Sequence, residues 1–173
     1  MLNAHKISLI AVLTALAIVL SIAESLIPSV GIPGVKLGLA NILILITLYE
    51  LGIKEAIFVN LCRVVLANIL RGTILSMGFL MSFAGASLSL AIMIIFYLFI
   101  KKFSIIGVSV IGSIFHVFGQ IIVAMFFMGT IYVLYYLPII AISAIITGVL
   151  VGFVSRIIIK SGTIKKLREK HGF

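Results

Sequence analysis

The run ISLIAVLTALAIVLSIAESLI, residues 7–27, contains one charged side chain, Glu24, near its far end. A helix of about 20 apolar residues crosses a bilayer core about 30 Å thick. The apolar core of a signal peptide is shorter than this run. We therefore interpret it as a transmembrane helix that is retained in the protein.

The rest of the chain has the same character. Of its 173 residues, 64% are hydrophobic and 10% are charged, and the mean hydropathy is +1.44. A soluble domain has about 45–50% apolar and about 25% charged residues, so this composition excludes a soluble globular protein. We expect one transmembrane domain over residues 1–160 and a basic cytoplasmic tail over residues 161–173.

Six apolar segments predict an all-α integral membrane protein, a bundle of six transmembrane helices. They cover residues 7–27, 36–53, 56–70, 74–100, 105–128 and 134–159. A Pro/Gly turn at SVGIPG, residues 29–34, separates the first two segments. The purely apolar part of the second segment, residues 37–49, is short, so this span is expected to be little tilted or to begin as a re-entrant segment.

Basic residues are shared unevenly between the two sides of this arrangement. One side receives His5, Lys6, Lys54, Lys101, Lys102, Arg156 and the lysine-rich tail, and the other receives only Lys36 and Arg71. The positive-inside rule then places both termini in the cytoplasm. Membrane topology therefore accounts for the net charge of +9, and we expect no nucleic-acid partner.

Residues for acid, metal and thiol chemistry are scarce. All four acidic residues are glutamates, so the aspartate-rich motifs that hold magnesium diphosphate in prenyl-chain synthases are missing, and no P-loop pattern is present. We expect no enzymatic activity of its own and no cofactor. Cys62 is the only cysteine and the three histidines are far apart, which predicts neither an intramolecular disulfide nor a metal site.

The third predicted span is the only one with several strongly polar residues. At 100° per residue, Asn60, Arg63 and Arg71 share one face of a helix. An arginine inside the bilayer costs at least about 2.5 kcal/mol unless it faces a cavity or a partner, which makes Arg63 a candidate functional residue. The alternative is an internal ion pair between Arg63 and Glu24, and the two roles are compatible.

A second polar face lies on the fifth predicted span, where His116 and Gln120 are one turn apart. Such residues in membrane helices more often form interhelical hydrogen bonds than bind ligands. Near the start of the second span, Lys36 supplies a cation and Asn41 follows further along.

Lys36, Arg63 and Arg71 are cations in the outer half of the bundle, where topology does not require them. Together they predict a site for an anionic or electron-rich group. The candidate substrate-binding residues are Glu24, Lys36, Asn41, Asn60, Arg63, Arg71, His116 and Gln120.

Small residues form rows on several predicted helices. In the first span, Ala11 and Ala15 lie on one face of the cytoplasmic half, whereas Ala17, Ser21 and Glu24 lie on a different face farther out. Rows of this kind usually mark close helix packing, and we interpret those on the fourth and sixth spans in this way. The first span can thus serve a helix contact on one face and a polar site on another.

Several motifs resemble those of a known family. They are PGVKLGLANI (33–42), N-x-x-R (60–63), SFAGASLSL (82–90), GSIFHVFGQ (112–120), YYLP (135–138) and ITGVLVG (146–152). Over roughly residues 22–153 the chain is similar to the Gx transporter family, which is catalogued as heptaprenyl diphosphate synthase component I and grouped with the S components of energy-coupling factor (ECF) transporters. Val117 departs from the pattern, because the family usually has His-Asn before the Gly-Gln pair.

The resemblance implies a six-helix substrate-binding subunit in a prokaryotic plasma membrane. Its partners would be a transmembrane coupling subunit and two ATPase subunits, with an A-x-x-x-A pattern at Ala11 and Ala15 as the docking motif. Its substrate would be a small molecule such as a vitamin, a vitamin precursor or an isoprenoid-related compound. Two alternatives remain open, namely a non-catalytic accessory subunit of a polyprenyl (heptaprenyl) diphosphate synthase and a structural membrane scaffold.

Overall fold

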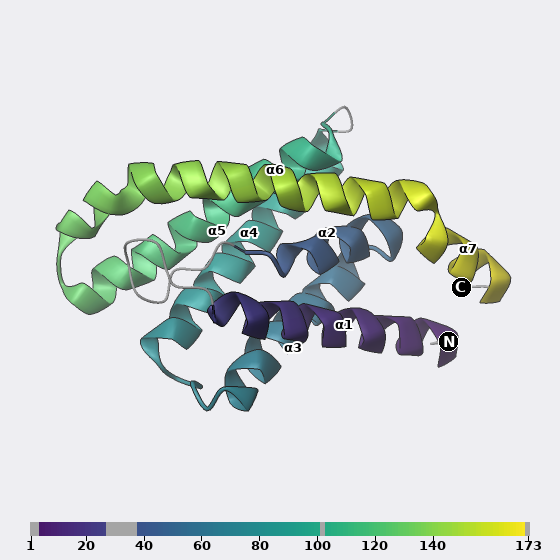
Figure 1. The fold of residues 1–173 in the computed structure, drawn as a ribbon, viewed down its shortest axis with the longest axis horizontal. Coiled ribbons are helices and arrows are strands. Elements are labelled where there is room, and N and C mark those ends of the chain that lie inside the picture. Colours follow the sequence, from purple (N-terminus) through teal and green to yellow (C-terminus); the bar gives the residue numbers. More distant parts are fainter. Residues whose placement is uncertain (1–3, 27–37, 101–102, 172–173) are drawn as a thin grey trace.

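The computed structural model describes residues 4–26, 38–100 and 103–171, and its described part is built from helices (Figure 1). In chain order these are α1 (Ala4–Ser25), α2 (Asn41–Glu50), α3 (Ile53–Leu70), α4 (Met77–Phe99), α5 (Ile105–Met128), the 3₁₀ helix η1 (Ile131–Tyr136), α6 (Leu137–Ser161) and α7 (Thr163–His171).

Four described segments are long and apolar enough to cross a membrane. They are α1, α4, α5 and the run Ile131–Lys170, which contains α6. Helix α2 has ten residues and α3 carries three charges within its 18 residues, so neither belongs to this set. The protein is thus an all-helical membrane protein, and the six spans expected from the sequence remain a prediction.

Helix α2 is the centre of the bundle rather than an outer span. It contacts α1, α3, α4, α5 and α6, and its middle residues Ile44, Leu45 and Ile46 are fully buried. At 1.5 Å per residue it is about 15 Å long, half the thickness of a bilayer core. Its neighbours cover its apolar surface, so α2 has little contact with the surroundings of the bundle.

The second predicted span, residues 36–53, was too long. Helix α2 starts only at Asn41, because Gly38 adopts φ +87°, a left-handed conformation outside the helix, and residues 38–40 form a turn. Gly52, with φ +113°, separates α2 from α3. The apolar pattern could not place these breaks, since Leu37, Leu39 and Ala40 are as apolar as the helix itself.

One end of the bundle collects the start of α1, the end of α2 and the C-terminal helix α7 (Figure 1). Lys6 of α1 forms a salt bridge with Glu55 of α3, and the Arg168 guanidinium of α7 donates a hydrogen bond of 2.7 Å to the Glu50 carbonyl at the end of α2. Ile164 anchors α7 in the core. Within the segment expected as a basic tail, Thr163–His171 is therefore helical and packs on the bundle.

Glycines permit the closest contacts between helices. A Cβ on Gly85 of α4 would lie 2.7 Å from the His116 carbonyl oxygen of α5, and one on Gly119 would lie 2.8 Å from the Ala84 carbonyl oxygen. Gly148 and Gly152 of α6 would meet α5 backbone atoms at 2.7 Å. Helices α4, α5 and α6 thus pack through small residues, which membrane helix interfaces favour.

Candidate functional site

Seven buried polar side chains from five helices gather around the N-terminal end of α2. We call them the polar cluster: Glu24 (α1), Asn41 (α2), Asn60 and Arg63 (α3), Ser89 (α4), and His116 and Gln120 (α5). Each is at most 5% exposed. Six of the eight residues predicted for the substrate site belong to this cluster, so the fold brings most of them together.

Arg63 is the centre of the polar cluster and is 4% exposed. Its Nη2 donates to the side-chain oxygens of Asn41 and Asn60, both at 3.0 Å, and its Nε donates to the Asn60 oxygen at 3.2 Å. Nη1 has no hydrogen-bond partner among the residues that the structure describes. Burying a guanidinium is costly unless its N–H groups make hydrogen bonds. The two neutral amide oxygens accept hydrogen bonds from Nε and Nη2 only.

The two asparagines are held by helix α4. The Asn60 amide nitrogen donates to the Ala86 carbonyl oxygen at 3.2 Å, and the Asn41 amide nitrogen donates to the Ser89 hydroxyl at 3.4 Å. These bonds direct both amide oxygens towards Arg63. Side chains of α2, α3 and α4 therefore orient one guanidinium.

Glu24 joins the end of α1 to the turn before α2. Its carboxylate accepts a hydrogen bond from the Gly38 backbone N–H and attracts both Arg63 and Arg71 electrostatically. The structure shows no salt bridge between Glu24 and Arg63 among the residues that it describes, so the predicted ion pair is a longer-range attraction. The side-chain oxygens of Asn41 and Asn60 accept the hydrogen bonds of the guanidinium instead. A carboxylate at this position also complements the positive end of the α2 dipole.

His116 and Gln120 form the α5 side of the polar cluster. Their Nε2 atoms lie 3.1 Å apart, which is hydrogen-bond distance. A Cβ on Gly38 would lie 3.6 Å from His116 Cδ2, and one on Gly85 would lie 2.9 Å from Gln120 Cγ. The absence of side chains at these two glycines lets the histidine and the glutamine approach both α4 and the turn before α2.

Two predicted residues stand apart from the polar cluster. Arg71 is half-buried at the end of α3, where its Nη2 donates to the Asn68 oxygen at 2.6 Å and its Nε to the Ala67 carbonyl oxygen at 3.0 Å. It lies at the edge of the cluster and is coupled to it through its attraction to Glu24. Lys36 lies outside the described residues.

The sequence did not single out Ser89, Gly38 or Asn68 as members of the site. Ser89 was assigned to a packing row, because a serine among small residues usually serves close helix contact. Gly38 shows its role only through its positive φ and its hydrogen bond to Glu24. Asn68 also accepts a hydrogen bond of 3.0 Å from Thr73, and its polarity inside an apolar helix was a signal that could have been used.

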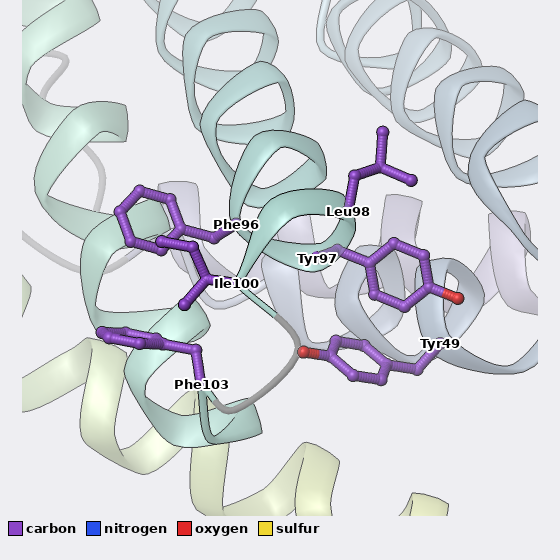
Figure 2. A pocket seen from close by; sticks show the side chains of 6 residues that line it. All are labelled: Tyr49, Phe96, Tyr97, Leu98, Ile100 and Phe103. Atoms are coloured by element: carbon purple, nitrogen blue, oxygen red, sulfur yellow. The ribbon is translucent and has the colours of Figure 1, made fainter.

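A separate pocket lies at the other end of α2. It has a volume of about 400 Å³ and is lined by Tyr49, Phe96, Tyr97, Leu98, Ile100 and Phe103 (Figure 2). The Tyr49 and Tyr97 rings meet edge to face at 5.0 Å. None of the predicted substrate residues lines this pocket.

The polar cluster combines several kinds of polar group. It holds one carboxylate and one guanidinium, together with the amides of Asn41, Asn60 and Gln120, the hydroxyl of Ser89 and the imidazole of His116. Among residues 4–26, 38–100 and 103–171, no three His, Cys, Asp or Glu side chains are placed to hold a metal ion. What the cluster offers a ligand is a buried cation and amide groups inside an apolar bundle.

These features define a helical, multi-pass membrane protein with a buried polar site between its helices. The model of the family described as heptaprenyl diphosphate synthase component I matches residues 13–158. The chain belongs to this family. No curated protein and no solved structure matches it in the corresponding comparisons.

Proposed function

We propose that the chain is the substrate-binding membrane subunit of an ECF-type importer in a prokaryotic plasma membrane. The observation that carries this proposal is the polar cluster around Arg63. A buried cation with unused hydrogen-bonding capacity inside an apolar bundle is costly for folding and is useful for holding a ligand. The substrate would be a small molecule such as a vitamin, a vitamin precursor or an isoprenoid-related compound.

The surface of α1 supports a partner on one face. Ala11 and Ala15 are exposed, whereas Ala17, Ser21 and Glu24 of the same helix are buried. One face of α1 thus contributes to the polar site, and another presents a small-residue surface that a second helix could approach closely. In the proposed importer this surface meets the transmembrane coupling subunit, and two ATPase subunits supply the energy.

The family description favours a second function, that of a non-catalytic accessory subunit of a heptaprenyl diphosphate synthase. The name implies a second synthase component as partner. The chain has no aspartate, so it lacks the magnesium diphosphate motifs of a prenyl-chain synthase. In this second function the membrane subunit would position a lipid or the catalytic partner.

Affinity purification of the tagged protein from its own membranes in mild detergent distinguishes the two functions. We expect recovery of a transmembrane coupling protein and paired ATPases, and loss of both when Ala11 and Ala15 are changed to leucine. Ala23→Leu is the matched control, because Ala23 is an exposed alanine farther along the same helix. Recovery of a soluble prenyl synthase component without ATPases would instead establish the accessory function.

A further inference from the structure

We infer that the ligand of the polar cluster carries a negatively charged acidic group, a carboxylate or a phosphate. The sequence predicted a site for an anionic or electron-rich group and did not decide between the two. The inference names the substrate class of the site in the proposed function, and rests on the charge balance, the buried guanidinium and the orientation of α2.

The charge balance around the site is positive. The chain has four acidic residues, and Glu50, Glu55 and Glu169 all lie towards the end of the bundle that carries α7. Within the part of the chain that the structure describes, Glu24 is therefore the only side-chain carboxylate near Arg63 and Arg71. Residues 27–37 contain no acidic residue and one lysine, so the sequence adds no negative charge from that segment. Two guanidinium groups thus share one carboxylate.

The Glu24 carboxylate also interacts with the backbone, so its negative charge does not serve the two arginines alone. Glu24 accepts a hydrogen bond from the Gly38 backbone N–H in the turn before α2. Its charge therefore acts on the positive end of the α2 dipole as well as on the two arginines. Asn41 and Asn60, which hydrogen-bond Arg63, are neutral and supply no countercharge. In a site that is nearly closed to water, an uncompensated cation stabilises a ligand that brings the missing charge.

The Arg63 guanidinium has donors left for such a ligand. Asn41 and Asn60 use Nε and Nη2, while Nη1 has no hydrogen-bond partner among the described residues, although the side chain is 4% exposed. Carboxylate and phosphate oxygens are the acceptors that an arginine binds most strongly. A neutral carbonyl could accept the same hydrogen bonds but would leave the charge unbalanced.

Binding of matched probes to the detergent-purified chain tests the inference. Benzoate is compared with benzamide, and phenyl phosphate with phenol, at constant ionic strength, by ligand-observed NMR. We expect the charged member of at least one pair to bind about tenfold more tightly, since each tenfold step corresponds to about 1.4 kcal/mol. Preference for benzoate indicates a carboxylate and preference for phenyl phosphate a phosphate. No preference for either anion over its neutral counterpart would overturn the inference.

Three variants change the charge of the site with little change in shape. Asn60→Asp adds a carboxylate beside Arg63 and should weaken anion binding at least about tenfold. Glu24→Gln keeps an oxygen that can accept the hydrogen bond of the Gly38 N–H but removes the negative charge. This substitution should strengthen anion binding severalfold. Arg71→Gln, at a half-buried position, should weaken anion binding and leaves the hydrogen bonds of Arg63 with Asn41 and Asn60 in place.

Arg156→Gln is the control, because it removes an exposed positive charge on α6 outside the polar cluster. Equal effects of Arg156→Gln and Arg71→Gln, or weaker anion binding in Glu24→Gln, would contradict the inference. The measurement uses the isolated chain, so its failure is distinct from that of the proposed function: an importer for a neutral substrate would still recover coupling protein and ATPases.

Discussion

Arg63 illustrates how a charged residue is accommodated within an apolar bundle. Its guanidinium lies between helices α2 and α3, and two asparagine oxygens accept its hydrogen bonds. Those asparagines are in turn held by α4. Because each partner is oriented by another helix, the position of Arg63 depends on the packing of the whole bundle and would change if one helix moved.

Gly85 provides a test of the close contact between α4 and α5. A Cβ at this position would lie 2.7 Å from the backbone carbonyl oxygen of His116, which cannot move without shifting α5. We expect Gly85→Ala to destabilise the protein by about 1–3 kcal/mol, as overpacking does in other cores, measured as a lower melting temperature in detergent.

Gly78→Ala is the matched control on the same helix. The nearest atom to its added Cβ would be the Ser76 hydroxyl oxygen at 3.7 Å, an ordinary contact distance. Equal melting temperatures for the two variants would show that the approach of α4 to α5 is looser than the distances indicate.

At the scale of secondary-structure elements, α2 connects the two ends of the bundle. Its first residue, Asn41, binds Arg63, and its last, Glu50, accepts a hydrogen bond from α7. Between them the helix is buried against five neighbours. A short helix can therefore hold part of the polar cluster in place although it does not have the length of a full membrane span.

Arg168 ties α7 to the end of α2. Its guanidinium is half-buried and donates to the Glu50 carbonyl oxygen, one of the carbonyls that a helix end leaves unsatisfied. We expect Arg168→Ala to lower stability by about 0.5–1.5 kcal/mol and to increase hydrogen exchange at the end of α2. Lys170→Ala, at an exposed position of the same helix, should change neither quantity. Equal effects of the two substitutions would show that the Arg168 hydrogen bond does not hold α7 to the end of α2.

The Lys6–Glu55 salt bridge, which joins α1 to α3, predicts a dependence of stability on pH. Glu55 lies one residue before the third predicted span, 56–70. Partial burial raises the pKa of its carboxyl, but hydrogen bonds and the charges of Lys6 and Lys54 outweigh burial and bring the pKa below its ordinary value of 4.5. The ionised form therefore stabilises the fold above about pH 4.5, and this contribution is lost as the pH falls through the lowered pKa.

Melting temperatures measured across this acidic range check that prediction. The wild-type protein should lose stability on acidification more steeply than Glu55→Gln, which cannot ionise. Glu169→Gln is the control, because Glu169 forms an exposed pair with Lys165 on α7 and contributes little. Identical pH profiles for wild type and Glu55→Gln would show that the pair does not stabilise the fold.

For the whole molecule, the orientation in the membrane can be tested directly. The start of α1 and helix α7 lie at the same end of the bundle (Figure 1), and the basic residues predict that this end is cytoplasmic. Protease should therefore remove tags at both termini from inside-out vesicles and from neither terminus in intact cells. Removal of one tag in each preparation would contradict an even number of spans.

The sequence by itself determined the class of protein and most helical segments. Residues 105–128 were predicted as a span and form α5 with the same bounds, because hydropathy over a helix length is a local property of the chain. Six of the seven residues of the polar cluster could also be found locally, since strongly polar side chains are unusual in apolar helices, whereas Ser89 could not be told from a packing residue.

Only the tertiary structure decided that α2 is the central helix and that Asn41, 22 residues before Arg63, accepts its hydrogen bond. The same holds for the bond from Gly38 to Glu24 and for the packing of α7 on the bundle. The physical reason is that contacts between helices depend on their crossing positions, which hundreds of side-chain contacts fix together. Helical period gives the face on which a residue lies but not the helix that this face meets.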